Sequence, residues 1–279
     1  MPFSVIEGTF HVVGYSPDGD SVRFRARDEA DWRKLSGPPV VLNAREHAQL
    51  RFEAIDTLET HYLNSHQPLA LATAALEFLL ADLGITDVEW NEARTEVTSA
   101  TDGTGGYILS RATEGNRRPV AFVYAGEPPQ GEEGSDVFLD VEKLRESVNY
   151  RSLERGLAYP TYYKGLFPDL REAMSAAVVR AREEGLGVWA EDRTNAGFAV
   201  EGPGSLSEEH VILPKLFRRL AEYLQAGGPV AGFDAFLEAR AEEIIVIPNV
   251  HATHLDTVVE VEGETVRMTE RPEDLIFEG

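Results

Sequence analysis

Cysteine is absent from the 279 residues of this chain. This absence excludes disulfide bonds and thiolate metal sites. Long apolar runs are absent too, since no stretch approaches the roughly 20 residues needed to cross a bilayer. The first residues, MPFSVIEGTFHVVG, lack the basic region and the long apolar segment of a secretory signal. We therefore expect a cytoplasmic protein that has no membrane partner.

Basic residues are scarce relative to acidic ones. The chain has 26 Lys and Arg against 48 Asp and Glu, which gives a formal net charge of -22. Such a charge repels polyanions at long range and counts against a nucleic-acid ligand, although solubility alone also explains an acidic surface. Apolar residues are plentiful by comparison, because a hydrophobic content of 43% is enough for a real core.

The first two thirds of the chain combine strand-like and helical stretches. A helix is expected to begin at Asn64 or Ser65 and to stop at Gly84. Further helices are expected at about 140–153 and 168–184. Strands are expected at 9–13, 21–26, 40–42, 50–55, 88–90, 95–98, 107–111 and 120–124. This order predicts an α+β fold that is mainly a small closed β-barrel with packed helices.

The character of the sequence changes after Asp192. The stretch TNAGFAVEGPGS is typical of a linker, so we expect one domain at residues 1–194 and a smaller α/β region at 195–279. The C-terminal region should contain an amphipathic helix opened by Ser205 and bent at Pro214.

A shorter helix at 233–240 and a β-hairpin around Gly263 should follow in the same region. This C-terminal region is a candidate for homo-oligomerisation, for a lid or for partner docking.

Three stretches suggest a common chemistry. They are PDGDSVRF at 17–24, LRFEAIDTLETH at 50–61, and ERGLAYPTYYKG followed by LREAMSAAVVRAREEGLGVWAED within 154–192. In this order they resemble the staphylococcal-nuclease-like (thermonuclease) family over roughly two thirds of the chain. The resemblance implies an OB-fold barrel, and active members of that family cleave the phosphodiester bonds of DNA or RNA with calcium.

The resemblance assigns a calcium site. Asp20 and Asp56 match the family's two calcium carboxylates, and the carbonyl of Thr57 would be a third ligand. Asp18 is near enough in sequence to contribute, although Asp-Gly is also ordinary turn chemistry. Calcium prefers several oxygen ligands, which suits this set. The alternative is that these residues are turns and strand ends on a solvated rim.

The resemblance also assigns catalytic and substrate-binding groups. Glu59 matches the residue that activates the attacking water, and Arg51 matches a guanidinium that holds the phosphate. Tyr159, Tyr162 and Tyr163 partly match the family's substrate-packing tyrosines. Packing of an aromatic-rich turn is the alternative for these three residues.

The chain departs from the family pattern at one catalytic position. The family's second arginine falls on Gly106, in what should be a turn, and Leu58 replaces a proline. Such an arginine contributes on the order of 10³–10⁵ in rate in phosphoryl transfer, so Gly106→Arg is expected to increase the rate if the loop faces the site. The sequence offers four candidate replacements: Arg45, Arg111, Arg117 and Arg118.

Two histidines in the C-terminal region form the string HxxHxD with Asp256. Histidine and carboxylate groups can bind zinc. However, His251 and His254 lie in a loop that enters a strand, where this spacing need not converge. A structural role is therefore favoured over a metal site.

Two functions remain open. One is a calcium-dependent phosphodiester hydrolase, a thermonuclease-like nuclease weakened by the missing arginine. The other is a catalytically degenerate OB-fold module that binds nucleic acid, nucleotide or protein. The retained set of Asp20, Asp56, Glu59 and Arg51 favours the enzyme, whereas the acidic charge and Gly106 favour the binding module.

Overall fold

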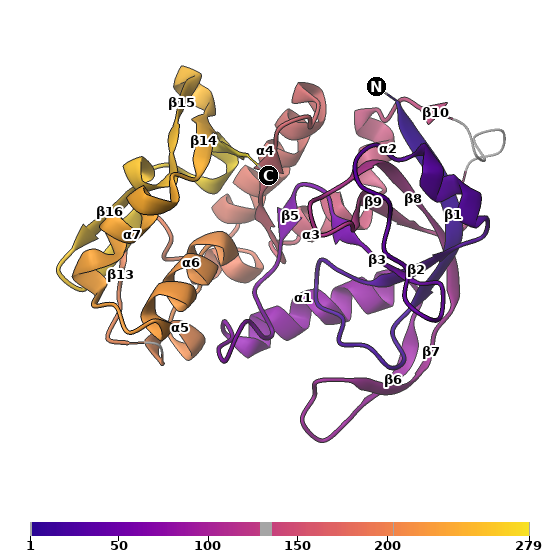
Figure 1. Ribbon diagram of the computed structural model, residues 1–279, viewed down its shortest axis with the longest axis horizontal. Helices are drawn as coiled ribbons and strands as arrows, with labels where there is room; N and C mark the ends of the chain where they lie inside the picture. Colours follow the sequence, from indigo (N-terminus) through magenta and orange to yellow (C-terminus); the bar gives the residue numbers. More distant parts are fainter. Residues whose placement is uncertain (1, 129–135, 203, 279) are drawn as a thin grey trace. The chain divides into compact units, whose positions relative to one another are not determined.

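The computed structural model describes residues 2–128, 136–202 and 204–278, and they fall into two compact units (Figure 1). One unit contains Met1–Glu53 and Leu76–Ser152, and we call it the barrel unit. The other contains Ala54–Ala75 and Leu153–Gly279, and we call it the mixed unit. This division lies elsewhere than the boundary near residue 194 that the composition suggested.

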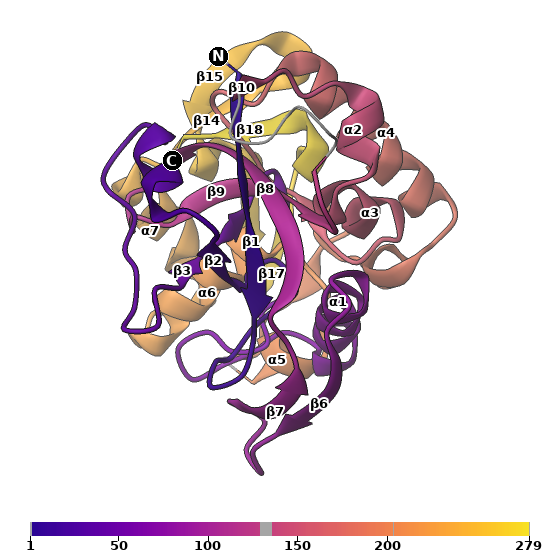
Figure 2. The ribbon, with the colours of Figure 1, turned by 90° about the vertical axis from the view of Figure 1, so that its right-hand side faces the viewer.

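The barrel unit is built on one strongly curved sheet (Figure 2). Its strands follow the order β3-β2-β1-β8-β9-β4, and β10 pairs with β1. Because only Leu50 separates β3 from β4, the two ends of this path are one piece of chain, and the six strands form a nearly closed barrel. The strands are β1 Phe3–His11, β2 Arg23–Ala26, β3 Ala48–Gln49, β4 Arg51–Phe52, β8 Thr104–Thr113, β9 Pro119–Ala125 and β10 Asp136–Val137.

The curved sheet of the barrel unit encloses an apolar core. Phe10, Phe24, Phe52 and Phe122 are at most 1% exposed, and the rings of Phe10 and Phe24 lie 5.0 Å apart. Each such side chain contributes roughly 1.5–3 kcal/mol through burial. From Ile6 to His11, β1 alternates between buried and partly exposed residues, which turns Phe10 toward the core.

Other elements complete the barrel unit. They are the 3-10 helix η1 Glu29–Lys34, the hairpin of β6 Thr86–Trp90 and β7 Val97–Thr101, and the helices α2 Val141–Arg145 and α3 Val148–Glu154. The single helix expected at 140–153 is thus two helices. The Ser147 hydroxyl donates to the Leu144 carbonyl and accepts from the Tyr150 amide, so it ends one helix and caps the next.

The prediction of one continuous strand at 50–55 is wrong, because a turn interrupts it. Glu53 and Ala54 form a turn, with Ala54 at φ +67°, so the chain makes β4 in the barrel unit and then β5 Ile55–Asp56 in the mixed unit. No strand forms at residues 40–42. A left-handed alanine is uncommon and has no signature in the sequence.

Helix α1 Leu69–Asp82 begins later than expected. Residues Tyr62 and Ser65 instead close a tight turn through two backbone hydrogen bonds, with Leu63 at φ +54°. Asn64 and Ser65 therefore belong to the turn, and Pro68 directly precedes the helix.

The mixed unit contains three small sheets and four α-helices among its described residues, besides the ends of α1 and α3. Strand β5 pairs with β11 Tyr159–Pro160. A four-stranded sheet has β12 Tyr162–Tyr163, β18 Leu275–Phe277, β14 Glu243–Val246 and β15 His251–His254, and a three-stranded sheet has β13 Phe198–Ala199, β17 Thr265–Met268 and β16 Val259–Glu262. The helices are α4 Pro168–Glu183, α5 Ser205–Glu208, α6 Pro214–Gln225 and α7 Phe233–Arg240, and the 3-10 helices are η2 Gly187–Ala190, η3 Val230–Gly232, η4 Ile247–Asn249, η5 Leu255–Val258 and η6 Pro272–Asp274.

Several predictions for the mixed unit are confirmed. Helix α4 buries Leu170, Met174 and Val178 on one face, and α7 has the expected bounds. The hairpin of β16 and β17 turns at Gly263. Two expectations are wrong: Pro214 starts α6 rather than bending it, and part of the linker-like stretch forms β13, which pairs with β17.

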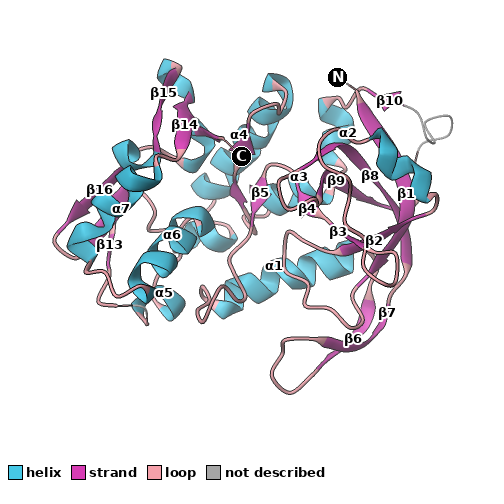
Figure 3. Cartoon of the chain, in the orientation of Figure 1, coloured by secondary structure: helices cyan, strands magenta, loops and turns pink. Residues whose placement is uncertain are grey.

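The elements in Figure 3 define an α+β protein in which a barrel-like sheet and several helices coexist. Within the described parts of the chain, each helix is too short or too polar to span a bilayer.

Candidate functional site

Asp56, Glu59 and Arg218 lie together in the mixed unit, and we call them the arginine–carboxylate cluster. The Arg218 guanidinium contacts both carboxylate oxygens of Asp56, with Nη1–Oδ1 at 3.0 Å and Nη2–Oδ2 at 2.6 Å. Its Nη1 also lies 2.5 Å from Oε1 of Glu59. The structure therefore brings the predicted ligand and the predicted base together, with an arginine that the sequence analysis did not single out.

The local structure explains how each group reaches the cluster. Asp56 ends β5 and pairs with Tyr159 of β11, which leaves it 3% exposed. Arg218 is on α6, where Lys215, Arg218 and Arg219 occupy one side of the helix at i, i+3 and i+4. This basic side is buried or half-buried, and each of the three cations pairs with an acidic residue.

Charge pairing dominates the electrostatics of the cluster. Burial alone lowers the pKa of Arg218, but the charges and hydrogen bonds of Asp56 and Glu59 outweigh it and hold this pKa well above its usual value. The guanidinium is therefore permanently charged. One positive and two negative groups leave a formal charge of −1 on the cluster.

Gln67 fixes the backbone of Glu59. The Gln67 amide N–H donates to the Glu59 carbonyl at 2.9 Å, and the side-chain Oε1 of Gln67 accepts from the Glu59 N–H at 3.2 Å. The Nε2 group of Gln67 donates to the carbonyl of Ile212, two residues before α6. Gln67 is completely buried and so ties the Glu59 loop to the start of the helix that carries Arg218.

Asp18, Asp20 and Arg51 belong to the barrel unit, where backbone contacts bring the segments that carry them side by side. The backbone carbonyl of Asp20 accepts from the Phe52 N–H at 3.1 Å, which sets the Asp18–Ser21 turn beside β4 and Arg51. Oδ1 of Asp18 is buried and has no hydrogen-bond partner. Burial raises the pKa of Glu53, and the charges of Arg111 and Arg51 offset this only in part.

The tyrosines of the predicted substrate site differ in exposure. Tyr159 and Tyr162 are completely buried, and their hydroxyls bond to Asp192 at 2.7 Å and to Ser175 at 2.9 Å. Tyr163 is half-buried. Packing thus accounts for the first two, and Tyr163 is the one of the three that presents surface to a ligand.

Gly106 does not lie in a turn, contrary to expectation. It is inside β8, between Gly8 of β1 and Ala125 of β9. A Cβ atom there would lie 2.2 Å from the Phe10 ring and 2.5 Å from the Tyr124 carbonyl oxygen. An arginine at this position would disrupt the barrel, so the expected gain from Gly106→Arg is withdrawn.

The four candidate replacement arginines have other contacts within the barrel unit. Nη1 of Arg45 donates to the Val13 carbonyl, and Nε of Arg117 donates to the Pro39 carbonyl, each at 2.8 Å. Arg111 stacks on the Phe3 ring, with its Cζ atom 4.6 Å from the ring centre, and Arg118 forms an ion pair with Glu114.

The cluster does not present a calcium site in this arrangement. Both oxygens of Asp56 face the guanidinium, and Thr57 beside it is buried. Among residues 2–128, 136–202 and 204–278, no three His, Asp or Glu side chains are grouped so that they could hold a metal ion.

The histidine string also fails to converge. His251 and His254 are exposed and three residues apart on β15, so they project from opposite sides of the strand. Asp256 follows in η5 with its Oδ1 buried and without a hydrogen-bond partner.

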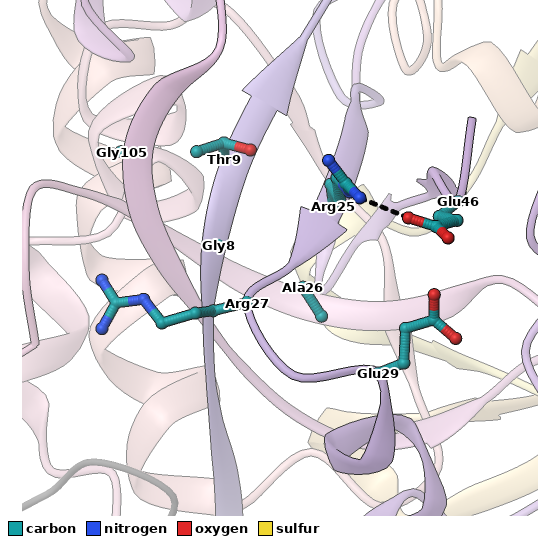
Figure 4. A pocket seen from close by; sticks show the side chains of 8 residues that line it. All are labelled: Gly8, Thr9, Arg25, Ala26, Arg27, Glu29, Glu46 and Gly105. Carbon is teal, nitrogen blue, oxygen red and sulfur yellow. Dashed lines mark hydrogen bonds and ion pairs between the residues drawn. The ribbon is translucent and has the colours of Figure 1, made fainter.

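A pocket of about 430 Å³ lies on the barrel unit, lined by β1, β2 and β8 (Figure 4). Arg25 pairs with Glu46 there, and Arg27 pairs with Glu7. Both cations are neutralised, and Gly8 and Gly105 supply bare backbone. The pocket therefore has the shape of a binding site but lacks an activated group.

Searches against protein-family models and curated proteins find no match to this chain. The chemistry of the arginine–carboxylate cluster is therefore inferred from its own residues and their contacts. Arg218 was missed because its partners lie 162 and 159 residues away in sequence. The available signal was the LFRRL segment of α6, in which two cations stand between apolar residues.

Proposed function

We propose that this protein is a phosphodiester hydrolase of the thermonuclease type, that its barrel is an OB-fold, and that Arg218 acts as the arginine missing at Gly106. The observation that carries the proposal is the contact of Arg218 with Glu59 and Asp56. A guanidinium beside a carboxylate base is suited to hold a phosphoryl oxygen while the base acts on water.

In the proposed reaction, Glu59 accepts a proton from water as the water oxygen bonds to phosphorus. The bond from phosphorus to the leaving oxygen breaks, and that oxygen takes a proton from solvent. Arg218 holds a phosphoryl oxygen, and Gln67 keeps Glu59 in place. Calcium, which the resemblance implies, would supply positive charge to the phosphate when bound.

The proposed substrate is a short or single-stranded nucleic acid or a nucleotide diester. The net charge of -22 disfavours long duplexes, which carry a dense negative charge. Tyr163, with its partly exposed ring, is proposed to contact the substrate.

The test compares the parent protein with Glu59→Gln on single-stranded DNA and on a small phosphodiester, with millimolar calcium. The parent should cleave both, and Glu59→Gln should lose about 10²–10⁴ in rate, the usual contribution of a general base. Glu260→Gln is the control, since Glu260 is about half exposed and pairs with Arg267. Equal rates for the parent and Glu59→Gln would show that the cleavage comes from a contaminant.

The second candidate is a binding module without catalysis. It is favoured by the neutralisation of Asp56 and Glu59 by Arg218, because a base held in an ion pair is less available to water. In that case the parent would cleave neither substrate. It would still bind labelled single-stranded DNA or a nucleotide in an anisotropy titration, and Glu59→Gln would bind equally well.

A further inference from the structure

We propose that Tyr15, Arg23 and Arg45 of the barrel unit form a binding site for a phosphate group, and we call them the guanidinium–tyrosine site. The two guanidiniums lie over the same Tyr15 ring, with Cζ of Arg23 at 5.0 Å and Cζ of Arg45 at 5.4 Å from the ring centre. These residues are separate from the arginine–carboxylate cluster, so the inference goes beyond the proposed function and does not rest on it.

Both guanidiniums lack a carboxylate partner. Within the part of the chain that the structure describes, neither Arg23 nor Arg45 forms an ion pair, although the chain has 48 Asp and Glu residues. The next outward-facing arginine of β2, Arg25, does pair with a carboxylate, that of Glu46. Two like charges beside one ring repel each other. An anion between them would remove this repulsion.

The position of Arg23 makes the missing partner costly. Arg23 is half-buried on β2, and its Nε is buried without a hydrogen-bond partner among the described residues. Burial lowers the pKa of this guanidinium, and the nearby Tyr15 offsets the effect only in part. A partly desolvated charge without a counter-charge is unfavourable. A bound anion would supply the missing negative charge.

Two neighbouring histidines indicate a positive field at the site. His11 and His47 stack with their ring centres 4.1 Å apart, and Nδ1 of His47 lies 3.1 Å from the Tyr15 hydroxyl oxygen. Burial is the main cause that lowers the pKa of His47 to about 4, and the positive charges of His11 and three arginines lower it further. The surroundings of Tyr15 therefore favour an anion.

The charged groups around these histidines sum to a positive value. The three arginines are Arg23, Arg25 and Arg45. Two carboxylates lie near them: Glu46 pairs with Arg25, and Asp102 is 4.0 Å from the first histidine of the pair. Three positive and two negative groups leave a formal charge of +1, whereas the whole chain has a net charge of -22. This region of the barrel unit should attract small anions at short range.

A phosphate group suits these cations better than other common anions. A phosphate monoester carries a charge of about −1.5 to −2 at neutral pH, which matches the two unpaired guanidiniums of Arg23 and Arg45. The planar fork of an arginine also fits the spacing of phosphate oxygens. Long nucleic acids are disfavoured, because the net charge of -22 repels a polyanion at long range. The ligand is therefore small, either inorganic phosphate or a nucleotide.

The pocket of about 430 Å³ adjoins the histidine pair and would hold the rest of a nucleotide. Thr9 and Arg25 line this pocket (Figure 4). Oγ1 of Thr9 lies 2.8 Å from Nε2 of His11, and the charge of Arg25 acts on both histidines. A volume of this size is typical of sites for small molecules.

The test is isothermal titration calorimetry with inorganic phosphate and with AMP, in a phosphate-free buffer of constant ionic strength. The parent should bind both, and Arg23→Gln and Arg45→Gln should each weaken binding about tenfold or more, as expected for the loss of a hydrogen bond between charged groups. Arg117→Gln is the matched control for Arg45→Gln, because both arginines are exposed and donate to a backbone carbonyl. Equal affinities in these two variants would overturn the inference, as would an absence of binding to the parent.

Two further ligands define the chemistry that the site recognises. Acetate carries one charge and adenosine none, so neither should bind at concentrations at which phosphate saturates the protein. Acetate that binds as tightly as phosphate would overturn the assignment to a phosphate group. AMP that binds more tightly than phosphate would identify a nucleotide as the ligand, and equal affinities would identify inorganic phosphate. Both of these results support the proposed site.

A second measurement needs only the parent, in case Arg23→Gln does not fold. The ring signals of His47 in NMR spectra, identified by their loss in His47→Asn, give its pKa with and without saturating phosphate. The titratable and charged groups around His47 are Tyr15 after β1, His11 of β1, Arg23 and Arg25 of β2, Arg45 and Glu46 before β3, and Asp102 beside His11.

Phosphate should raise the pKa of His47 from about 4, because its negative charge would offset the positive charges that act on this ring. An unchanged pKa would refute a phosphate beside Tyr15. Neither measurement involves turnover or a residue of the arginine–carboxylate cluster. An inactive protein that binds phosphate would therefore refute only the proposed catalysis, and an active enzyme that does not bind it would refute only this inference.

Discussion

The barrel unit and the mixed unit differ in what they enclose. Among the described residues, the acidic and basic side chains that belong to residues at most 5% exposed are Asp56, Lys215 and Glu273, and all three lie in the mixed unit. The buried polar residues of the barrel unit are Ser, Thr, Asn and one histidine. Apolar packing therefore stabilises the barrel unit, whereas the mixed unit also depends on matched internal charges.

This difference has a physical consequence. A buried ion pair adds little net stability compared with apolar packing, but loss of one partner leaves an uncompensated charge. An internal charge network is therefore costly to retain unless it has a use. In the mixed unit this network reaches Glu59, which is the proposed base.

The largest expected effect is on the stability of the mixed unit. Arg218→Met should lower the free energy of unfolding by roughly 3–5 kcal/mol, because Asp56 would remain buried without a counter-charge. Urea unfolding in the presence of a chelator measures this loss. Arg267→Met is the control, since Arg267 and Glu260 are both about half exposed, and it should cost less than about 1 kcal/mol. Similar losses for the two variants would contradict the comparison.

The two units should also respond to different ranges of pH. Burial, with the nearby charges of His11 and Arg45, lowers the pKa of His47 in the barrel unit to about 4. The unfolded histidine titrates near 6.5, so stability is complete above pH 6.5 and falls by roughly 3 kcal/mol as the pH drops to about 4.

In the mixed unit, burial raises the pKa of Glu242, but Arg219 and Lys215 outweigh it and lower this pKa to about 2. Its contribution is present above pH 4.5 and is lost between pH 4.5 and about 2. Urea unfolding as a function of pH measures both effects. His47→Asn should remove the change in unfolding free energy between pH 6.5 and about 4. Glu242→Gln should remove the change between pH 4.5 and about 2. If His47→Asn changed the lower pH range and Glu242→Gln the higher one, the environments described for these two side chains would be wrong.

A smaller effect tests the close packing of the barrel unit. Gly106→Ala should cost about 2 kcal/mol, because its Cβ would meet the Phe10 ring and the Tyr124 carbonyl. Gly105→Ala is a matched control, since nothing lies within 4 Å of a Cβ at that position, and it should change stability by less than about 0.5 kcal/mol. Thermal unfolding of the two variants would distinguish them, and equal melting temperatures would argue against tight packing at Gly106.

The sequence predicted those helices and turns whose faces and ends are set by residues close together in the chain. The apolar spacing of Leu170, Met174 and Val178 was sufficient for α4, and Gly263 was sufficient for the hairpin. The break after β4 could not be predicted, because Ala54 is not a residue typical of a left-handed turn.

Prediction of the candidate site was limited by long-range pairing. Asp56 and Glu59 were identified from a motif and do lie together. Arg218 reaches them only through the folding of α6, and no spacing within the chain indicates a contact over about 160 residues. Side chains that converge through tertiary packing leave no local signal.

The proposed role of Arg218 is tested most directly by the calcium-dependent cleavage rate of a short single-stranded DNA by Arg218→Ala. We expect a rate lower than that of the parent by roughly 10³ or more, which is the contribution of an arginine that stabilises phosphoryl transfer. Arg219→Ala, altered at the neighbouring residue, should remain within about tenfold of the parent. An Arg218→Ala rate equal to or above that of Arg219→Ala would contradict the claim that Arg218 acts on the phosphate.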